Sequence, residues 1–134
     1  MAVEQPLFSV GLYEAASDYN DSTDQWSLVN LTTDNPPRVV VTDTSGEWVL
    51  GVLGNLPSSG QAAVVITDGI SKCLASSTHA AIQPGDRLYS RDNGTVNSGT
   101  TESFNIFGRA LDVVAADTSA ILTFKFTHEG AGSS

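Results

Sequence analysis

The sequence predicts an all-β fold, built as a single-domain antiparallel β-barrel or β-sandwich with an extended N-terminal arm. Three observations predict it. Helical periodicity is almost absent from the 134 residues. Short runs rich in Val, Ile, Thr and aromatic residues recur along the chain, which is typical of strands. Gly, Pro, Asn and Asp separate these runs at short spacing, as in antiparallel sheets.

The first half of the chain contains four predicted strands. Pro36-Pro37 stops any helix and starts an extended run, because proline fixes its own φ and restricts the residue before it. The turn Asp43–Gly46 connects this run to the next one. The four segments are 26–32, 38–42, 47–53 and 62–67.

Two dipeptides in the second half predict tight hairpins. Asp68-Gly69 and Asn93-Gly94 carry the residues that type I′ turns prefer, because both central positions of that turn need φ > 0. The first pair predicts a hairpin of 62–67 with 70–74. The second predicts a hairpin of 86–91 with 95–96.

Two longer strands close the chain. Segment 104–114 contains Gly108, which marks a bulge or a close approach of another backbone. Segment 120–127 alternates strictly, so that every second side chain falls on one face. We expect that face to be buried, and its members are Ala120, Leu122, Phe124 and Phe126.

The length fits one domain covering residues 1–134, large enough to bury its own core. Residues 1–17 are polar and weakly patterned, which predicts an N-terminal arm, and residues 129–134 predict a frayed tail. Large apolar side chains in such an arm need a partner to bury against, which is either another molecule or the chain's own domain. The candidate contact residues are Leu7, Phe8, Leu12, Tyr13 and Tyr19.

The charge balance excludes some partners. The chain has 15 acidic and 6 basic residues and a net charge of −9. Nucleic acid and anionic membranes bind through clustered Lys and Arg, so neither is expected as a partner. Six acidic residues precede the first basic residue, Arg38. This acidic segment either serves solubility or faces a basic partner. The chain also lacks the roughly 20-residue apolar run of a membrane helix, and its start does not resemble a secretory signal.

The reactive side chains are few. Cys73 is the single cysteine, so no intrachain disulfide is expected. It could form a nucleophilic pair with His79 or His128, but a free cysteine in an apolar strand is more typical of a buried hydrophobe. Two histidines and one cysteine are also too few for a structural zinc site. We therefore expect no catalytic residue, no metal and no cofactor.

Two loops resemble ligand-binding motifs only in part. Gly54 and Gly60 bracket a glycine-rich loop, but Gln61 stands where a phosphate-binding loop needs lysine, and a β-run follows instead of a helix. We interpret Asn55–Gly60 as a connection between strands. The acidic segment 18–24 has Thr23 where a calcium loop of the EF-hand type needs glycine, and is interpreted as a solvated turn.

The order of features from about residue 18 onward resembles tailed-bacteriophage capsid decoration proteins, also called head-stabilising or cement proteins. "DQWSLVNLTTD" resembles the family's first strand, and "GEWVLGVLGNLPSSGQAAVVITDGISKCLA" its central segment. "AAIQPGDRLYSRDNGTV" and "FNIFGRALDVVAADTSAILTFKF" resemble its later hairpin and closing strand pair. The first seventeen residues have no counterpart in this resemblance.

This resemblance implies a non-enzymatic structural protein on the outer surface of a phage head. It implies the major capsid protein as partner, a homotrimer as assembly, and stabilisation of the expanded capsid by bridging its subunits. The N-terminal contact residues would then touch the capsid or a neighbouring copy. Two alternatives stay open: a carbohydrate- or receptor-binding β-module, and a small hydrolase that uses Cys73.

Overall fold

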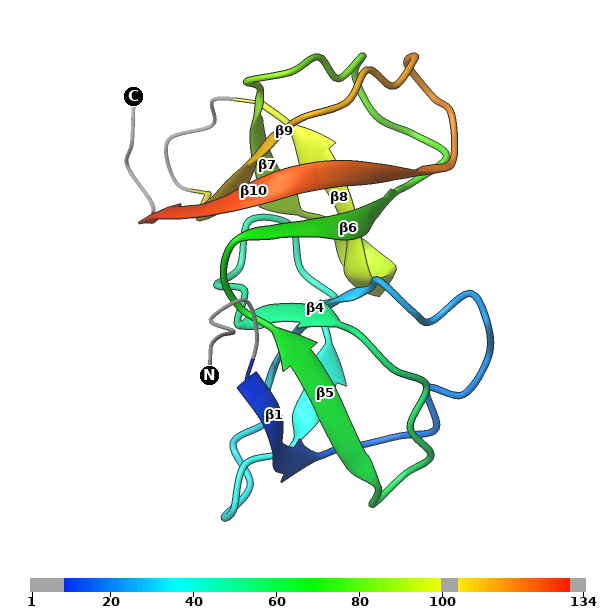
Figure 1. The fold of residues 1–134 in the computed structure, drawn as a ribbon, viewed down its shortest axis with the longest axis vertical. Helices are drawn as coiled ribbons and strands as arrows, with labels where there is room; N and C mark the ends of the chain where they lie inside the picture. Colours follow the sequence, from blue (N-terminus) through cyan, green and yellow to red (C-terminus); the bar gives the residue numbers. More distant parts are fainter. Residues whose placement is uncertain (1–8, 100–103, 131–134) are drawn as a thin grey trace, which may run out of the picture.

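Two β-structures are stacked end to end in the computed structural model, which describes residues 9–99 and 104–130 (Figure 1). The lower one is a five-stranded sheet and the upper one a closed five-stranded barrel. Strand order in the sheet is β1-β5-β4-β2-β3. The sheet strands are β1 (Ser9–Glu14), β2 (Leu28–Leu31), β3 (Val39–Val41), β4 (Gly51–Leu53) and β5 (Ala62–Ile66).

Strand order in the barrel is β10-β6-β8-β7-β9, closing on β10 again. All its pairings are antiparallel except that of β6 with β8. The all-β prediction is confirmed, and no helix in either described range is long and apolar enough to cross a membrane. The barrel strands are β6 (Ile70–Ala75), β7 (Arg87–Ser90), β8 (Thr95–Ser98), β9 (Ile106–Ala110) and β10 (Ala120–Gly130).

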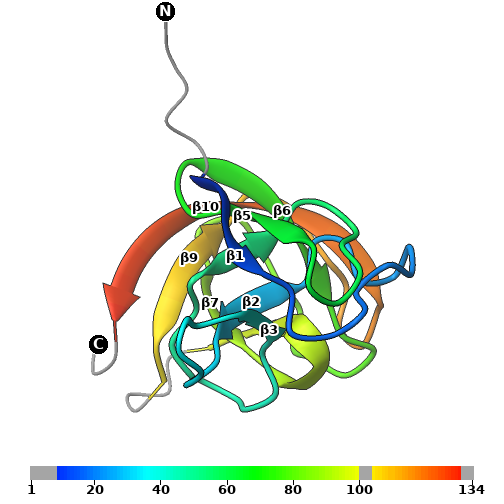
Figure 2. The same cartoon turned by 90° about the horizontal axis from the view of Figure 1, so that it is seen from below.

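The sheet curls so that its two ends meet. Just after β1, Ala15 forms a parallel bridge with Val39 of β3, and the Ala16 N–H donates to the Val39 carbonyl at 2.8 Å. Figure 2 views the curled sheet from below. The concave side encloses a small apolar core of Val29, Val39, Leu53, Ala63 and Val65.

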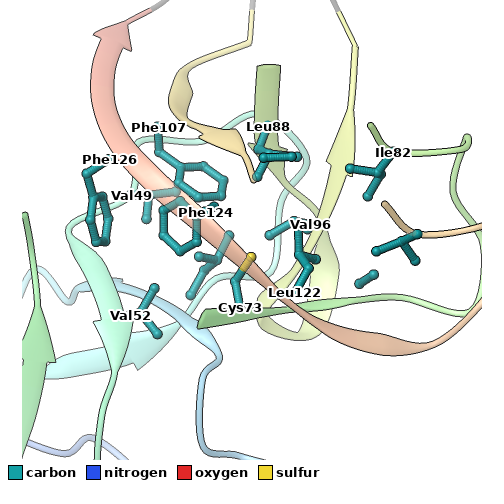
Figure 3. Close-up of a cluster of buried hydrophobic side chains, with 14 residues drawn as sticks. Val49, Val52, Cys73, Ile82, Leu88, Val96, Phe107, Leu122, Phe124 and Phe126 are labelled. Carbon is teal, nitrogen blue, oxygen red and sulfur yellow. The ribbon is translucent and has the colours of Figure 1, made fainter. Parts of the chain in front are cut away.

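A larger core joins the barrel to the sheet (Figure 3). The predicted alternation of β10 fills much of it, because Leu122, Phe124 and Phe126 are buried and Ala120 packs against them. Phe124 stacks edge-on against Phe107 and Phe126, with ring centroids 5.2 and 4.7 Å apart. Leu28, Val49 and Val52 contribute to the same cluster from the sheet side. The prediction of one domain remains a prediction, and this shared core supports it.

The hairpin predicted at Asp68-Gly69 is wrong. Its flanking strands do not pair with each other: β5 pairs with β1 and β4, whereas β6 pairs with β10 and β8. Of the two turn residues only Gly69 has positive φ, at 80°. The turn therefore carries the chain from the sheet into the barrel. Asp68-Gly69 correctly predicted a sharp turn. Whether the two strands beside a turn pair with each other depends on the other strands that the fold places next to them.

The second hairpin is confirmed. β7 and β8 pair through Leu88–Ser98 and Ser90–Val96. Asn93 and Gly94 both have positive φ, at 56° and 71°, and the Thr95 N–H closes the turn onto the Asp92 carbonyl. These are the features of a type I′ turn.

The tip of this hairpin docks onto the sheet. Gly94 donates its N–H to the Thr42 carbonyl at 2.9 Å. A Cβ atom at Gly94 would lie 2.7 Å from the Ser27 Cβ and 2.8 Å from a Val41 methyl. Glycine is thus favoured at position 94 for two reasons: the backbone has a positive φ, and the close contact with the sheet leaves no room for a side chain. In β9, the close approach predicted at Gly108 is also found, with the Lys125 carbonyl 2.6 Å from the position of a Cβ.

The extent of the N-terminal arm needs correction. Residues 9–14 form β1, the edge strand of the chain's own sheet, with Ser9 opposite Val65 and Glu14 opposite Ala62. Segment 15–17 continues into the bridge with β3. The alternation was hidden by a register shift between Val10 and Tyr13, because such an irregularity breaks the period of two that sequence reading relies on.

The predicted tail boundary is also corrected. Glu129 belongs to β10 and accepts a bidentate pair from Arg109, at 2.9 and 3.1 Å. Arg87 Nε lies 3.6 Å from the same carboxylate. An ion pair between β7, β9 and β10 therefore holds the end of the last strand. Residues 131–134 of the predicted tail lie outside the described ranges.

This ion pair predicts a pH effect on stability. The hydrogen bonds from Arg109, assisted by Thr127, lower the pKa of Glu129 below its ordinary value. A carboxylate with a depressed folded-state pKa contributes stability above its unfolded pKa of about 4.3, and loses it as pH falls through the folded pKa. Glu129→Gln should therefore lower the melting temperature at neutral pH.

The difference between the Glu129→Gln variant and the parent should shrink as pH drops below about 4, where the parent loses its own charge. Melting curves of both proteins between neutral pH and pH 2.5 (about two units below that pKa) measure this. Arg38→Gln is the control, because the Arg38–Asp34 pair is solvent-exposed and exposed pairs contribute little. A constant difference between Glu129→Gln and parent at every pH would contradict the assignment.

Candidate functional site

Cys73 lies in the shared core and does not form a nucleophilic site (Figure 3). The side chain is fully buried. Burial, reinforced by the negative charge of Asp112, raises the pKa of the Cys73 thiol well above its ordinary value. Because the thiolate is the reactive form, this environment suppresses the chemistry that a cysteine hydrolase needs. The alternative expectation of a small buried hydrophobe fits the structure.

The two histidines have structural partners. His79 is buried in the β6–β7 connection, where its ring nitrogens lie 2.6 Å from the Ala80 carbonyl and 2.7 Å from that of Thr118. His128 stacks on Phe126 and lies 2.8 Å from the Thr67 carbonyl. The Thr118 N–H also lies 3.2 Å from His79 Nε2, and the Asp68 carboxylate lies 3.7 Å from His128 Nε2. None of these polar contacts involves Cys73.

The acidic segment 18–24 folds onto itself and onto a neighbouring loop. Asp21 accepts hydrogen bonds from the Thr23 N–H and hydroxyl, both at 3.1 Å, and these bonds lower its pKa. Asp18 accepts from the Ser59 N–H at 2.8 Å. Within the described residues no group of three or more His, Cys, Asp or Glu side chains is arranged to hold a metal ion.

The glycine-rich loop 55–60 is tied to the strands it connects. The Asn55 side chain accepts from the Val64 N–H at 2.9 Å and donates to the Ala62 carbonyl at 3.1 Å. Pro57 is buried, and Gly60 has the permissive φ of 82°. The Ser58 hydroxyl accepts a hydrogen bond from the exposed Asn20 side chain at 3.2 Å. The contacts of the loop are those of a strand connection.

We therefore expect the free energy of unfolding of the Ser58→Ala, Ser59→Ala double variant to lie within about 1 kcal/mol of the parent's, as is usual for substitutions at the surface. Thermal melting and assembly measured on the same sample check this. Asn55→Ala is the contrasting variant, because it removes two hydrogen bonds to β5 and should destabilise by about 1–3 kcal/mol. Loss of a ligand-binding or hydrolytic activity in the serine double variant would contradict the structural interpretation.

The predicted contact residues that the structure describes lie in or against the chain's own sheet. Leu7 and Phe8 lie outside the described residues, and Leu12 belongs to β1. Tyr13 and Tyr19 both pack against the small core of the sheet, and the Tyr19 hydroxyl accepts the Val41 N–H at 3.2 Å. Both rings therefore have partners within their own chain, and a contact of either with the capsid or another copy stays a prediction.

Sequence reading missed the exposed apolar side chains that the structure presents. Trp48, which was assigned to a strand, lies in the β3–β4 connection and is 53% exposed. It lines a hollow of about 80 Å³ with Asn105, Phe107 and His128. Ile70 and Ile121 are 57% and 55% exposed on β6 and β10. In β10 the alternation of Ile121 with the buried Leu122 was visible in the sequence and was the signal for its outward position. In β6 the inward side chains are small or polar, so no such pattern marked Ile70 as exposed.

Comparisons with known proteins establish the fold. No family model matches the sequence, and no curated protein matches it. Among solved structures, the N base of head fiber gp8.5 of bacteriophage phi29 superimposes with a TM-score of 0.69. The match covers 92% of this chain and 98% of the phage protein at 15% sequence identity. The sheet-and-barrel architecture described above is therefore the fold of a phage head protein.

Proposed function

We propose that this chain is a non-enzymatic structural protein of a phage virion. It binds the outer surface of the head, contacts the major capsid protein as a homotrimer, and stabilises the expanded capsid by bridging neighbouring subunits. The observation that carries the proposal is the near-complete match to a head fiber base. The family resemblance of the sequence points to the same location independently of the superposition.

General principles of binding explain how such a protein would stabilise a capsid. A protein that binds only the assembled, expanded lattice stabilises that lattice by mass action. Bridging several subunits makes each further contact intramolecular, so modest contacts give tight attachment. The net charge of −9 also limits association between decorated particles. The buried Cys73 argues against the hydrolase alternative.

Co-sedimentation tests the proposal. The chain should pellet with expanded capsids of its phage, fail to pellet with unexpanded shells, and raise the temperature at which expanded shells release DNA. Bovine serum albumin at the same concentration controls for trapping in the pellet. Equal recovery with and without expanded capsids would overturn the proposal.

One observation favours the receptor-binding alternative. Trp48 offers a half-exposed aromatic surface beside a hollow that contains the polar side chains Asn105 and His128, and aromatic faces with adjacent polar groups suit sugar rings. Glycan-array binding that disappears in Trp48→Ala, but persists in the equally exposed control Ile121→Ala, would support this second function. Absence of binding to any glycan would remove it.

A further inference from the structure

The outer face of two paired barrel strands combines exposed apolar and cationic side chains. β6 and β10 run side by side across the barrel (Figure 1). Residues directly opposite each other share a face. The pairs that point outward are Leu74 with Ile121, Lys72 with Thr123, and Ile70 with Lys125. We call these six residues the β6–β10 face.

The composition of this face is unusual for the molecule. Lys72 and Lys125 are the two lysines of the whole chain, and both stand exposed on it. Ile70 and Ile121 are more than half exposed beside them. A hollow of about 340 Å³ adjoins its apolar end, lined by Leu74 and Ile121 and by Ser22 and Thr23 of the acidic segment. Clustered exposed apolar side chains of this kind mark interaction sites.

The charges of the chain are divided between its two β-structures. Residues 1–67, called the sheet part because they contain all five sheet strands, carry eight acidic residues and one basic residue. Residues 68–134, called the barrel part because they contain all five barrel strands, carry seven acidic and five basic residues. The net charge is therefore −7 for the sheet part and −2 for the barrel part. The lysine-bearing face and the acidic sheet have complementary charge, which favours contact between different surfaces of two copies.

The acidic segment 18–24 is the part of the sheet best placed to supply that contact. Asp34 is paired with Arg38, and Glu47 accepts hydrogen bonds from the Asp43 and Thr44 N–H groups. Asp18 and Asp21 are exposed, and neither takes part in a salt bridge among the described residues. Each also accepts a backbone hydrogen bond, from Ser59 and Thr23 respectively, but an exposed carboxylate keeps further lone pairs for a cation of another molecule.

We propose that the β6–β10 face binds a second copy of this chain through its acidic segment 18–24. The occupant is the acidic segment of the neighbouring copy, with Lys72 and Lys125 facing Asp18 and Asp21. Ile121 and Ile70 add apolar contacts at the two ends of the face. Such a contact joins two different surfaces, so its repetition closes a ring when the rotation permits. This inference deepens the homotrimer of the proposed function and rests on it.

Sedimentation velocity on the free full-length chain tests the contact. The parent should self-associate, and raising the salt from about 0.05 M to about 0.5 M should weaken association because screening shortens the reach of the charges. Lys125→Glu should raise the dissociation constant by roughly tenfold or more, as loss of a close interfacial charge pair does. Lys72→Glu with Lys125→Glu should leave only monomer.

The matched control is Arg38→Glu, which changes the net charge by the same amount as Lys125→Glu. It lies on the acidic sheet, so association should be unchanged or stronger. Adding Asp18→Lys and Asp21→Lys to the double lysine variant restores opposite charges across the contact and should restore association. Circular dichroism verifies that each variant is folded.

Several results would overturn the contact. One is a parent that stays monomeric at low salt and high concentration. Another is an equal loss of self-association in Lys125→Glu and Arg38→Glu. The third is a folded charge-swapped chain that does not regain self-association. Capsid co-sedimentation of the same samples separates the two proposals. A monomeric parent that still binds expanded capsids would refute the contact and retain the proposed function. A chain that self-associates as described but does not bind expanded capsids would support the contact and refute the proposed function.

Discussion

Deleting residues 2–14 should destabilise the protein strongly, because the deletion removes β1 from the sheet. The loss includes the pairing with β5 from Ser9 to Glu14 and the packing of Tyr13 on the small core. Burial of a large side chain contributes about 1.5–3 kcal/mol and each strand hydrogen bond about 0.5–1.5 kcal/mol. The melting temperature should therefore fall by roughly 15 °C or more. The freed edge of β5 should also promote aggregation.

The matched control is the shorter deletion of residues 2–8, which leaves β1 in place. Its free energy of unfolding should lie within about 1 kcal/mol of the parent's. It also tests what remains of the arm proposal, since Leu7 and Phe8 are removed: capsid co-sedimentation should weaken while the fold persists. Thermal melting of both truncations is the measurement. Near-parental melting of the longer deletion would show that β1 is dispensable.

Gly94→Ala should be strongly destabilising because two costs coincide at this position. A side chain at φ 71° is strained by about 1–3 kcal/mol. The added Cβ would also crowd Ser27 and Val41 at 2.7 and 2.8 Å, and overpacking costs a further 1–3 kcal/mol or so. The hairpin tip and the sheet would have to separate, which weakens the junction between the two β-structures.

Gly60→Ala isolates the first cost. Gly60 has a similar φ of 82°, but nothing lies within 4 Å of the position of its Cβ. Its loss in unfolding free energy should therefore be smaller than that of Gly94→Ala by about the overpacking cost. Denaturant unfolding of both variants measures the difference. Equal losses would mean that the hairpin tip does not depend on its close fit to the sheet.

Local patterns in the sequence predicted much of the secondary structure. Alternation in β10 identified Leu122, Phe124 and Phe126 as core residues, and all three are buried. Asn93-Gly94 identified a type I′ hairpin, because few other residues adopt two successive positive φ angles. The alternation in β10 also placed Ile121 on the outward face. In β6 no alternation of polar and apolar residues placed Ile70 outward, because its inward neighbours Ser71 and Cys73 are small.

The candidate site was less predictable. Trp48 reads as a strand residue, yet it lies exposed in a connection, because burial depends on neighbours that come from distant segments. For Tyr13 and Tyr19 the sequence left two partners open, another molecule or the chain's own domain, and the structure shows both rings packed on the sheet core. Whether an apolar residue near the N-terminus is an anchor or a core member depends on whether the rest of the chain offers it a surface.

The sequence by itself determined the all-β class, the turn at Asn93-Gly94 and the buried face of β10, because each follows from backbone preferences of a few adjacent residues. Tertiary structure alone decided that β5 and β6 separate into sheet and barrel, that residues 9–14 pair with β5, and that both lysines share one face. Pairing partners are chosen by burial and hydrogen bonding summed over segments far apart in the chain. No local pattern contains that sum, which is why Asp68-Gly69 marked a turn correctly and a hairpin wrongly.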